Sequence, residues 1–167
     1  MKVILVEKLF RITKNRVKLE NTLEVKITNR GREVSVQGKP ENEYIAEKVI
    51  DALNFGFPFA AAISIKNEEN VFEFLNIKDH TKVKDLKRVR GRIIGKEGRT
   101  LKTISNISDC YLERRENEIG IIGPTENIEH AQNAIISIIK GSKQTNAYAG
   151  LEKSKQRPVG DLGLKKK

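Results

Sequence analysis

Two glycines placed three residues apart, Gly95 and Gly98, constrain the fold of this chain more than any other feature. The apolar pair Ile93-Ile94 runs directly into the first glycine, and Lys96 adds charge between the two. A turn that lies against a phosphate chain needs glycine, because a Cβ atom would hold the backbone away from its ligand. Glycines at this spacing also occur in ordinary turns between helices. The pattern therefore predicts a phosphate-binding turn only if the flanking elements fit one.

The sequence on either side of this GxxG turn (residues 95–98) predicts a helix before it and a helix after it. Leu86, Val89 and Ile93 recur at helical spacing, and Gly95 ends that helix. Runs rich in β-forming residues, bounded by turn residues, predict the strands. In chain order we expect a strand at 71–77, helices at 84–94 and 99–108, strands at 110–114 and 119–122, and a long helix between Pro124 and Gly141.

Positive charge is concentrated around the GxxG turn. The net charge is +10, and residues 72–167 hold 20 of the 32 basic side chains against 12 acidic ones. Because the signs do not alternate, the repulsion stays unrelieved until a polyanion binds, which favours a nucleic acid. A solvated basic helix face is the alternative interpretation. The densest patch, opposed only by Asp85 and Glu97, consists of Lys82, Lys84, Lys87, Arg88, Arg90, Arg92, Lys96, Arg99 and Lys102.

The first part of the chain repeats the second at an offset of about 85 residues, as in a duplication. The ungapped matches pair Gly38 with Gly123, Glu41 with Glu126, Asn42 with Asn127, Ala46 with Ala131, Ile50 with Ile135, Leu53 with Ile138 and Gly56 with Gly141. Upstream of these matches the first copy is about 14 residues shorter, and residues 1–70 contain no GxxG. We therefore expect the first copy to keep its strands and last helix but to lack about one helix and the turn.

Residue patterns typical of enzymes and metal sites are absent from the sequence. The stretch from Gly91 to Lys96 resembles a nucleotide-binding P-loop, but the spacing is one residue short and Glu97 stands where Ser or Thr would hold magnesium. His80 and His130 are isolated, and the single Cys110 excludes a disulfide framework within the chain. No apolar run is long enough for a membrane span or a signal peptide. We expect a cytoplasmic binding protein that is not an enzyme and uses no cofactor, metal or small-molecule substrate.

The binding hypothesis places a single-stranded backbone on the GxxG turn. Lys96 and Arg99 would meet the phosphates, Leu112 and Arg114 would touch the bases, and Ile94 would form an apolar floor together with Ile104. The acidic Glu97 faces a polyanion, and the sequence offers no account of its role. The full predicted RNA-binding set is Arg90, Arg92, Ile94, Gly95, Lys96, Glu97, Gly98, Arg99, Lys102, Leu112 and Arg114.

A GxxG turn that clamps about four backbone nucleotides is the signature of KH domains. Residues 88–100, Arg-Val-Arg-Gly-Arg-Ile-Ile-Gly-Lys-Glu-Gly-Arg-Thr, closely resemble the archaeal KH-domain ribosome-assembly proteins and their eukaryotic relatives, the pre-rRNA processing factors called partner of Nob. Residues 138–142, Tyr148 and residues 55–57 also resemble that family. This chain departs from the family at one point: some archaeal relatives keep a GxxG in the first module, and residues 1–70 of this chain contain none.

The resemblance implies an α+β fold of two type I KH-like modules in tandem, each a three-stranded antiparallel sheet packed on helices. The second would have the order β-α-α-β-β-α, and the first would be degenerate and shortened. We expect a degenerate module lacking GxxG at 1–57, a connecting helix or linker at 58–70, a KH domain with GxxG at 71–142 and a basic tail at 143–167. A short helix near 146–156, anchored by Tyr148 and Leu151, is expected in the tail, with the rest disordered when free.

The function implied by the resemblance is that of an RNA-binding assembly factor of the small ribosomal subunit. It would bind single-stranded small-subunit rRNA near its 3′ end and assist the endonuclease that matures that end. A translation initiation factor is a further candidate partner. The alternative is a protein-interaction adapter that uses its KH folds to hold a nuclease or a translation factor, and a more distant one is a regulator that binds mRNA.

Overall fold

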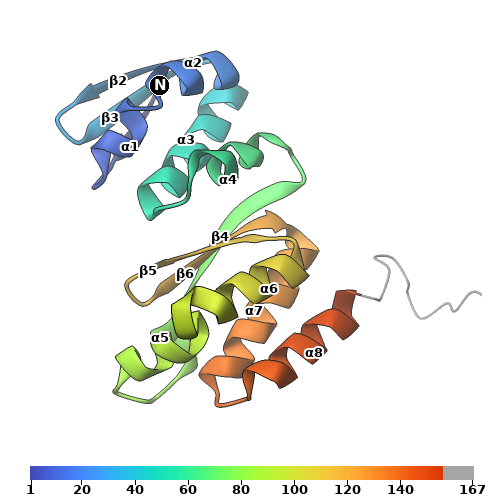
Figure 1. Ribbon diagram of the computed structural model, residues 1–167. Coiled ribbons are helices and arrows are strands. Elements are labelled where there is room, and N and C mark those ends of the chain that lie inside the picture. Colours follow the sequence, from blue (N-terminus) through green and yellow to red (C-terminus); the bar gives the residue numbers. More distant parts are fainter. Residues whose placement is uncertain (156–167) are drawn as a thin grey trace, which may run out of the picture. The chain divides into compact units, whose positions relative to one another are not determined.

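The computed structural model describes residues 1–155, and the chain divides into two compact units, Met1–Phe72 and the residues from Glu73 onward (Figure 1). Each unit contains one three-stranded antiparallel sheet packed on helices, so the fold is α+β and KH-like, as predicted. Among the described helices, none has the length and apolar character needed to cross a membrane.

Unit 1 is built around the central strand of its sheet, which has the order β1-β3-β2. Val34 and Val36 of that strand are fully buried, and the long helix α3, in which Val49, Ile50 and Leu53 are buried, packs on it. The elements are β1 (Lys2–Leu5), α1 (Leu9–Thr13), α2 (Arg16–Leu23), β2 (Val25–Arg30), β3 (Glu33–Gly38), α3 (Pro40–Phe55), α4 (Phe59–Ile63) and the 3₁₀ turn Ser64–Lys66.

The first two helices of unit 1 correct the expectation that one helix is missing. Both helices are present, with five residues in α1 and eight in α2. Ile12 and Leu19 are buried and give these short helices their place in the core. Their apolar positions are too few and too far apart to show helical periodicity, so the sequence pattern missed them. Only the GxxG turn is absent, and Lys14 at the junction keeps a right-handed helical conformation.

An aromatic cluster closes the end of α3 in unit 1. The rings of Phe55 and Phe57 stack with centroids 5.6 Å apart, and Phe72 meets both of them edge-on at 5.6 and 5.5 Å. Phe55 and Phe57 are buried, while Phe59 at the start of α4 is half-buried. Within the segment 58–70, where a connecting helix or linker is expected, the structure has the helix α4, which packs on α3.

Unit 2 has the predicted element order, and its sheet has the order β4-β6-β5. The helix predicted at 99–108 matches α6 at both ends, and the other predicted boundaries differ by a few residues. The elements are β4 (Asn70–Asn76), whose first three residues fall in unit 1, the 3₁₀ turn Ile77–His80, α5 (Leu86–Ile94), the 3₁₀ turn Lys96–Gly98, α6 (Arg99–Ser108), β5 (Tyr111–Arg115), β6 (Glu118–Pro124), α7 (Thr125–Ile139) and α8 (Gln144–Lys155).

The core of unit 2 lies between its sheet and the helices α5, α6 and α7. The apolar stripe of α7 is buried throughout and consists of Ile128, Ala131, Ala134, Ile135, Ile138 and Ile139. The helix expected near 146–156 is observed as α8, and Ala147 and Leu151 bury its apolar side while Tyr148 is half-buried. The remainder of the predicted basic tail, residues 156–167, lies outside the described residues.

Candidate nucleic-acid interface

The GxxG turn connects α5 to α6 through backbone conformations that residues with a side chain seldom adopt. Gly95, Glu97 and Gly98 have φ angles of 76°, 56° and 75°. The N–H of Gly95 donates to the carbonyl of Gly91 at 2.8 Å and ends α5, and the N–H of Gly98 donates to the carbonyl of Gly95 at 3.2 Å. Lys96 and Glu97 are exposed, so the turn is open to a ligand and is not part of a continuous helix.

The two glycines of the turn are required for different reasons. A Cβ on Gly95 would overlap the hydroxyl of Thr100 and stand only 2.7 Å from that residue's Cβ. Gly95 therefore makes room for the first turn of α6, inside the protein. A Cβ on Gly98 would have no atom within 4 Å and would point into open space. Gly98 is thus the position where a missing side chain lets a ligand approach the backbone.

Most of the predicted basic patch is exposed. Lys96 stands on the turn itself, and Arg99 and Lys102 stand on the following α6. Residues three apart share one face of a helix, so Arg99 and Lys102 present their charges side by side. The other exposed members, which lie on α5 and on the segment before it, are Lys82, Lys84, Lys87 and Arg88.

Arg99 also forms an ion pair with Glu97, the acidic residue in the turn. Its Nη2 lies 3.9 Å from Oε2 of Glu97, and the two side chains are 77% and 74% exposed. An ion pair this exposed contributes about 0–1 kcal/mol, so an arriving phosphate can displace the carboxylate from the guanidinium. Glu97 therefore partly neutralises Arg99 in the free protein.

Arg90 and Arg92 differ from the exposed cations because both are half-buried and hydrogen-bonded within unit 2. Nη1 of Arg90 donates to Oδ1 of Asn117, in the turn between β5 and β6, at 3.2 Å. Nη2 of Arg92 donates to the carbonyl of Ser142, between α7 and α8, at 2.9 Å. These partners lie far away in the sequence, so charge patterning alone could not identify them.

The predicted base contacts lie on β5, which is an edge strand of its sheet. Leu112 and Arg114 stand opposite Ile121 and Ile119 of β6, which are fully buried. Because residues opposite each other in a sheet share a face, both predicted residues lie on the side of these core isoleucines. Leu112 is half-buried and Arg114 is exposed. The edge position leaves this part of the strand accessible from the side.

The structure places the two residues of the predicted apolar floor differently. Ile94 is half-buried, as a surface contact requires, but Ile104 is fully buried and belongs to the core. Leu101, one turn earlier on α6, is half-buried and is the better candidate for a base contact. The sequence did not single out Leu101 because Leu101 and Ile104 belong to one apolar stripe of α6. Helical periodicity does not show which residues of such a stripe are buried by the rest of the protein.

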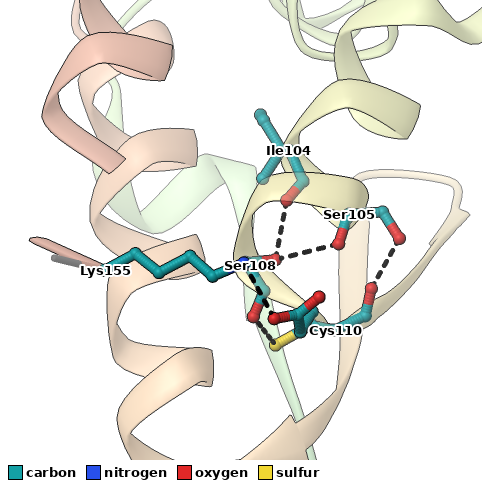
Figure 2. Close-up of polar contacts among 6 residues, drawn as sticks. Ile104, Ser105, Ser108, Cys110 and Lys155 are labelled. Carbon is teal, nitrogen blue, oxygen red and sulfur yellow. Dashed lines mark hydrogen bonds and ion pairs between the residues drawn. The ribbon is translucent and has the colours of Figure 1, made fainter. Parts of the chain in front are cut away.

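The connection between α6 and β5 is fixed by polar contacts around Cys110 (Figure 2). The Ser105 hydroxyl donates to the Cys110 carbonyl, and the Cys110 thiol lies 3.6 Å from the Ser108 carbonyl. Burial raises the pKa of the Cys110 thiol to about 11. A Cβ on Gly123 would come within 2.8 Å of the Cys110 sulfur, so β6 packs closely here. These contacts set the position of β5 relative to α6.

An exposed GxxG turn between two helices, on a β-α-α-β-β-α unit, defines a type I KH domain. The family model of the second KH domain of PNO1 proteins, described as a eukaryotic-type KH domain (KH domain type I), matches residues 71–156. The chain belongs to this family, and the resemblance seen at residues 88–100 is confirmed.

Three relatives illustrate the family. A KH domain-containing protein of Methanocaldococcus jannaschii is 27% identical over 84% of this chain and 62% of its own length. The pre-rRNA-processing protein pno1 of Emericella nidulans is 32% identical over 64% of this chain and 43% of its own length. A chain of the solved a/eIF2alpha-aDim2p-rRNA complex from Pyrococcus horikoshii is 28% identical, with a TM-score of 0.81 over 93% of this chain and 94% of that one. The chain thus spans less than two thirds of the length of these two curated relatives.

Proposed function

We propose that this chain is a non-catalytic RNA-binding factor in the assembly of the small ribosomal subunit. The observation that carries the proposal is the open GxxG turn, in which Gly98 leaves the backbone accessible and exposed cations follow. Lys96 and Lys102 have no ion-pair partner among residues 1–155, so their charge is available to a phosphate. The names of the relatives, which include an rRNA complex and a pre-rRNA-processing protein, support the same ligand.

The binding mechanism uses the turn for the backbone and β5 for the bases. Lys96, Arg99 and Lys102 would neutralise successive phosphates of a single strand. Each neutralised phosphate contributes about −0.7 to the slope of log K against log salt, so three contacts predict a slope of about −2. Bases would reach Ile94 and Leu101 on the helices, and Leu112 and Arg114 on β5, where hydrogen bonds and apolar contacts select the sequence.

Unit 1 is proposed to be a second KH-type module that has no clamp. Its sheet order, β1-β3-β2, corresponds to β4-β6-β5, and its helices occupy the same places in the chain order. The junction of α1 and α2 has no residue with positive φ, whereas the GxxG turn has three. In this proposal the chain comprises a module at 1–57, a connection at 58–70, a KH domain at 71–142 and a basic tail at 143–167.

The proposed target is single-stranded rRNA near the 3′ end of the small-subunit rRNA, in the cytoplasm. The maturation endonuclease and a translation initiation factor are the proposed protein partners. The solved complex of aDim2p with a/eIF2alpha and rRNA supports an rRNA ligand and a translation-factor partner. The proposal that the endonuclease is a partner rests on the family resemblance alone.

A protein-interaction adapter is the second candidate, and the surface of unit 1 favours it. Val3 and Leu5 lie on one face of the edge strand β1 and are 56% and 73% exposed. Phe10 and Val17, on the two short helices, are 62% and 67% exposed. An adapter would bind its protein partner through apolar surface of this kind, and that binding would survive the loss of charge in the GxxG turn.

The deciding experiment changes Lys96 and Glu97 together to Asp and leaves both glycines in place. The matched control changes Lys153 and Glu152 to Asp, which alters the charge equally at two exposed positions of α8. Binding is measured with a single-stranded oligonucleotide of the small-subunit rRNA 3′ end. We expect the first variant to lose most of its affinity and the control to keep it. Unchanged affinity in the first variant would exclude the GxxG turn as the RNA site.

A further inference from the structure

We propose that α8 braces the GxxG turn, with Arg92 and Gln144 as positioning residues. The inference rests on the proposed function, because its ligand is the same RNA. Arg92 lies in the last turn of α5, three residues before Gly95, and Gln144 is the first residue of α8. The two residues are joined by contacts that fix the end of α5, which is where the backbone enters the GxxG turn.

The contacts run in both directions between α5 and the start of α8. The Arg92 guanidinium donates to the Ser142 carbonyl at 2.9 Å, and the Gln144 side-chain amide donates to the Arg92 carbonyl at 3.4 Å. The last four carbonyls of a helix have no partner within the helix. Because α5 ends at Ile94, the Arg92 carbonyl is one of these, and Gln144 supplies a donor for it.

The turn before α8 directs that helix back across the unit. Gly141 has a φ of 110°, and its N–H donates to the carbonyl of Ile138 at 3.1 Å. This reversal lays α8 against α7 and α6, where Ala147 and Leu151 are buried. The matched family segment, residues 71–156, includes the whole of α8, so the helix is part of the domain that the family shares.

The far end of α8 contacts the end of α6. Nζ of Lys155 lies 3.0 Å from Oδ2 of Asp109, which ends α6 in a left-handed conformation with a φ of 54° (Figure 2). The pair is exposed and contributes little by itself. Leu151 lies between the two ends of α8 and is buried. Together, α8 and the turn before it therefore contact both α5 and α6, the helices that the GxxG turn joins.

The brace matters because the turn holds three residues with positive φ. For Glu97, the one of the three that has a side chain, this conformation is costly and persists only when the surrounding structure enforces it. If only a fraction of molecules holds the binding conformation, the apparent affinity falls by that fraction. A brace that fixes the end of α5 raises this fraction without touching the RNA.

The test uses Gln144→Met, which removes the donor but keeps the length of the side chain and its neutral charge. Thr145→Met is the matched control, at the next and exposed position of α8. Amide hydrogen exchange of residues 95–99 is measured in the free protein, and affinity for the rRNA 3′-end oligonucleotide is measured over a range of salt concentrations. A second variant, Arg92→Lys, keeps the charge and loses the fork geometry.

We expect both variants to exchange faster at residues 95–99 and to bind about five-fold more weakly, with an unchanged salt slope because no phosphate contact is lost. Unchanged exchange in both variants would overturn the brace, whether or not the slope of log K against log salt changes. Failure of the wild-type protein to bind the oligonucleotide would refute the proposed function instead, and the exchange data would still decide whether α8 braces the turn.

Discussion

Replacing Gly95 by Ala tests whether the GxxG turn is built as described. The residue has a φ of 76° and a ψ of 175°, a combination that is essentially restricted to glycine. The new methyl group would also overlap Thr100, whose Cβ and backbone N lie 2.7 and 2.8 Å from its position. Thr100 is buried, so it has no free space into which to move.

The free energy of unfolding should fall by several kcal/mol. The backbone conformation costs about 1–3 kcal/mol for a residue with a side chain, and overpacking costs about 1–3 kcal/mol more. Gly98→Ala meets only the first penalty, at about 1 kcal/mol, because no atom lies within 4 Å of its Cβ position. Gly91→Ala should stabilise the protein by about 0.5–1 kcal/mol, because Gly91 is in α5 with open space around it.

The assay is thermal and urea unfolding of the three full-length variants, monitored by circular dichroism. Hydrogen exchange then shows whether each change in stability lies in unit 2. A change of about 1 kcal/mol shifts the melting temperature of a small domain by about 4–8 °C. Gly95→Ala should therefore lower it by at least about 10 °C, while Gly91→Ala raises it. Equal losses for Gly95→Ala and Gly98→Ala would refute the reasoning from Thr100.

Three further predictions concern the turn and the buried thiol. Gly98→Ala should fold but bind the rRNA oligonucleotide about ten-fold more weakly, since the methyl group stands where the phosphate approaches; unchanged binding would contradict this. Glu97→Gln should strengthen binding about two- to five-fold at low salt, because Arg99 loses its carboxylate partner, and a gain that persists at high salt would count against this cause. Burial raises the pKa of Cys110 to about 11, so its neutral thiol stabilises the fold fully below the unfolded value of about 8.5, and that contribution is lost as pH rises through about 11. Melting temperatures measured across this range should fall less steeply for Cys110→Ala than for the wild-type protein, and parallel curves would show that the thiol has no such effect.

The architecture of unit 2 could be predicted because each element carries its own periodic signal. The apolar stripe of α7 and the spacing of Leu86, Val89 and Ile93 identify helices from local sequence alone. Gly95 and Gly141 mark two of the chain reversals, and both have positive φ. Local patterns of this kind do not depend on which segments meet in space.

The parts that could not be predicted depend on contacts between distant segments. Helices α1 and α2 are too short to show a period, and only packing on α3 reveals them. The partner of Arg92 lies 50 residues away, so a half-buried guanidinium could not be separated from an exposed one. Ile104 and Leu101 look equivalent in the sequence, and burial alone distinguishes them.

An NMR titration of the full chain with the single-stranded rRNA 3′-end oligonucleotide would show whether RNA binds at the GxxG turn. The amide signals of residues 95–99, Lys102, Leu112 and Arg114 are followed as the RNA is added. We predict the largest shifts at these positions, and a fall in RNA affinity of about 10² when the salt concentration is raised about ten-fold. Shifts confined to other residues, with these signals unmoved, would contradict this prediction.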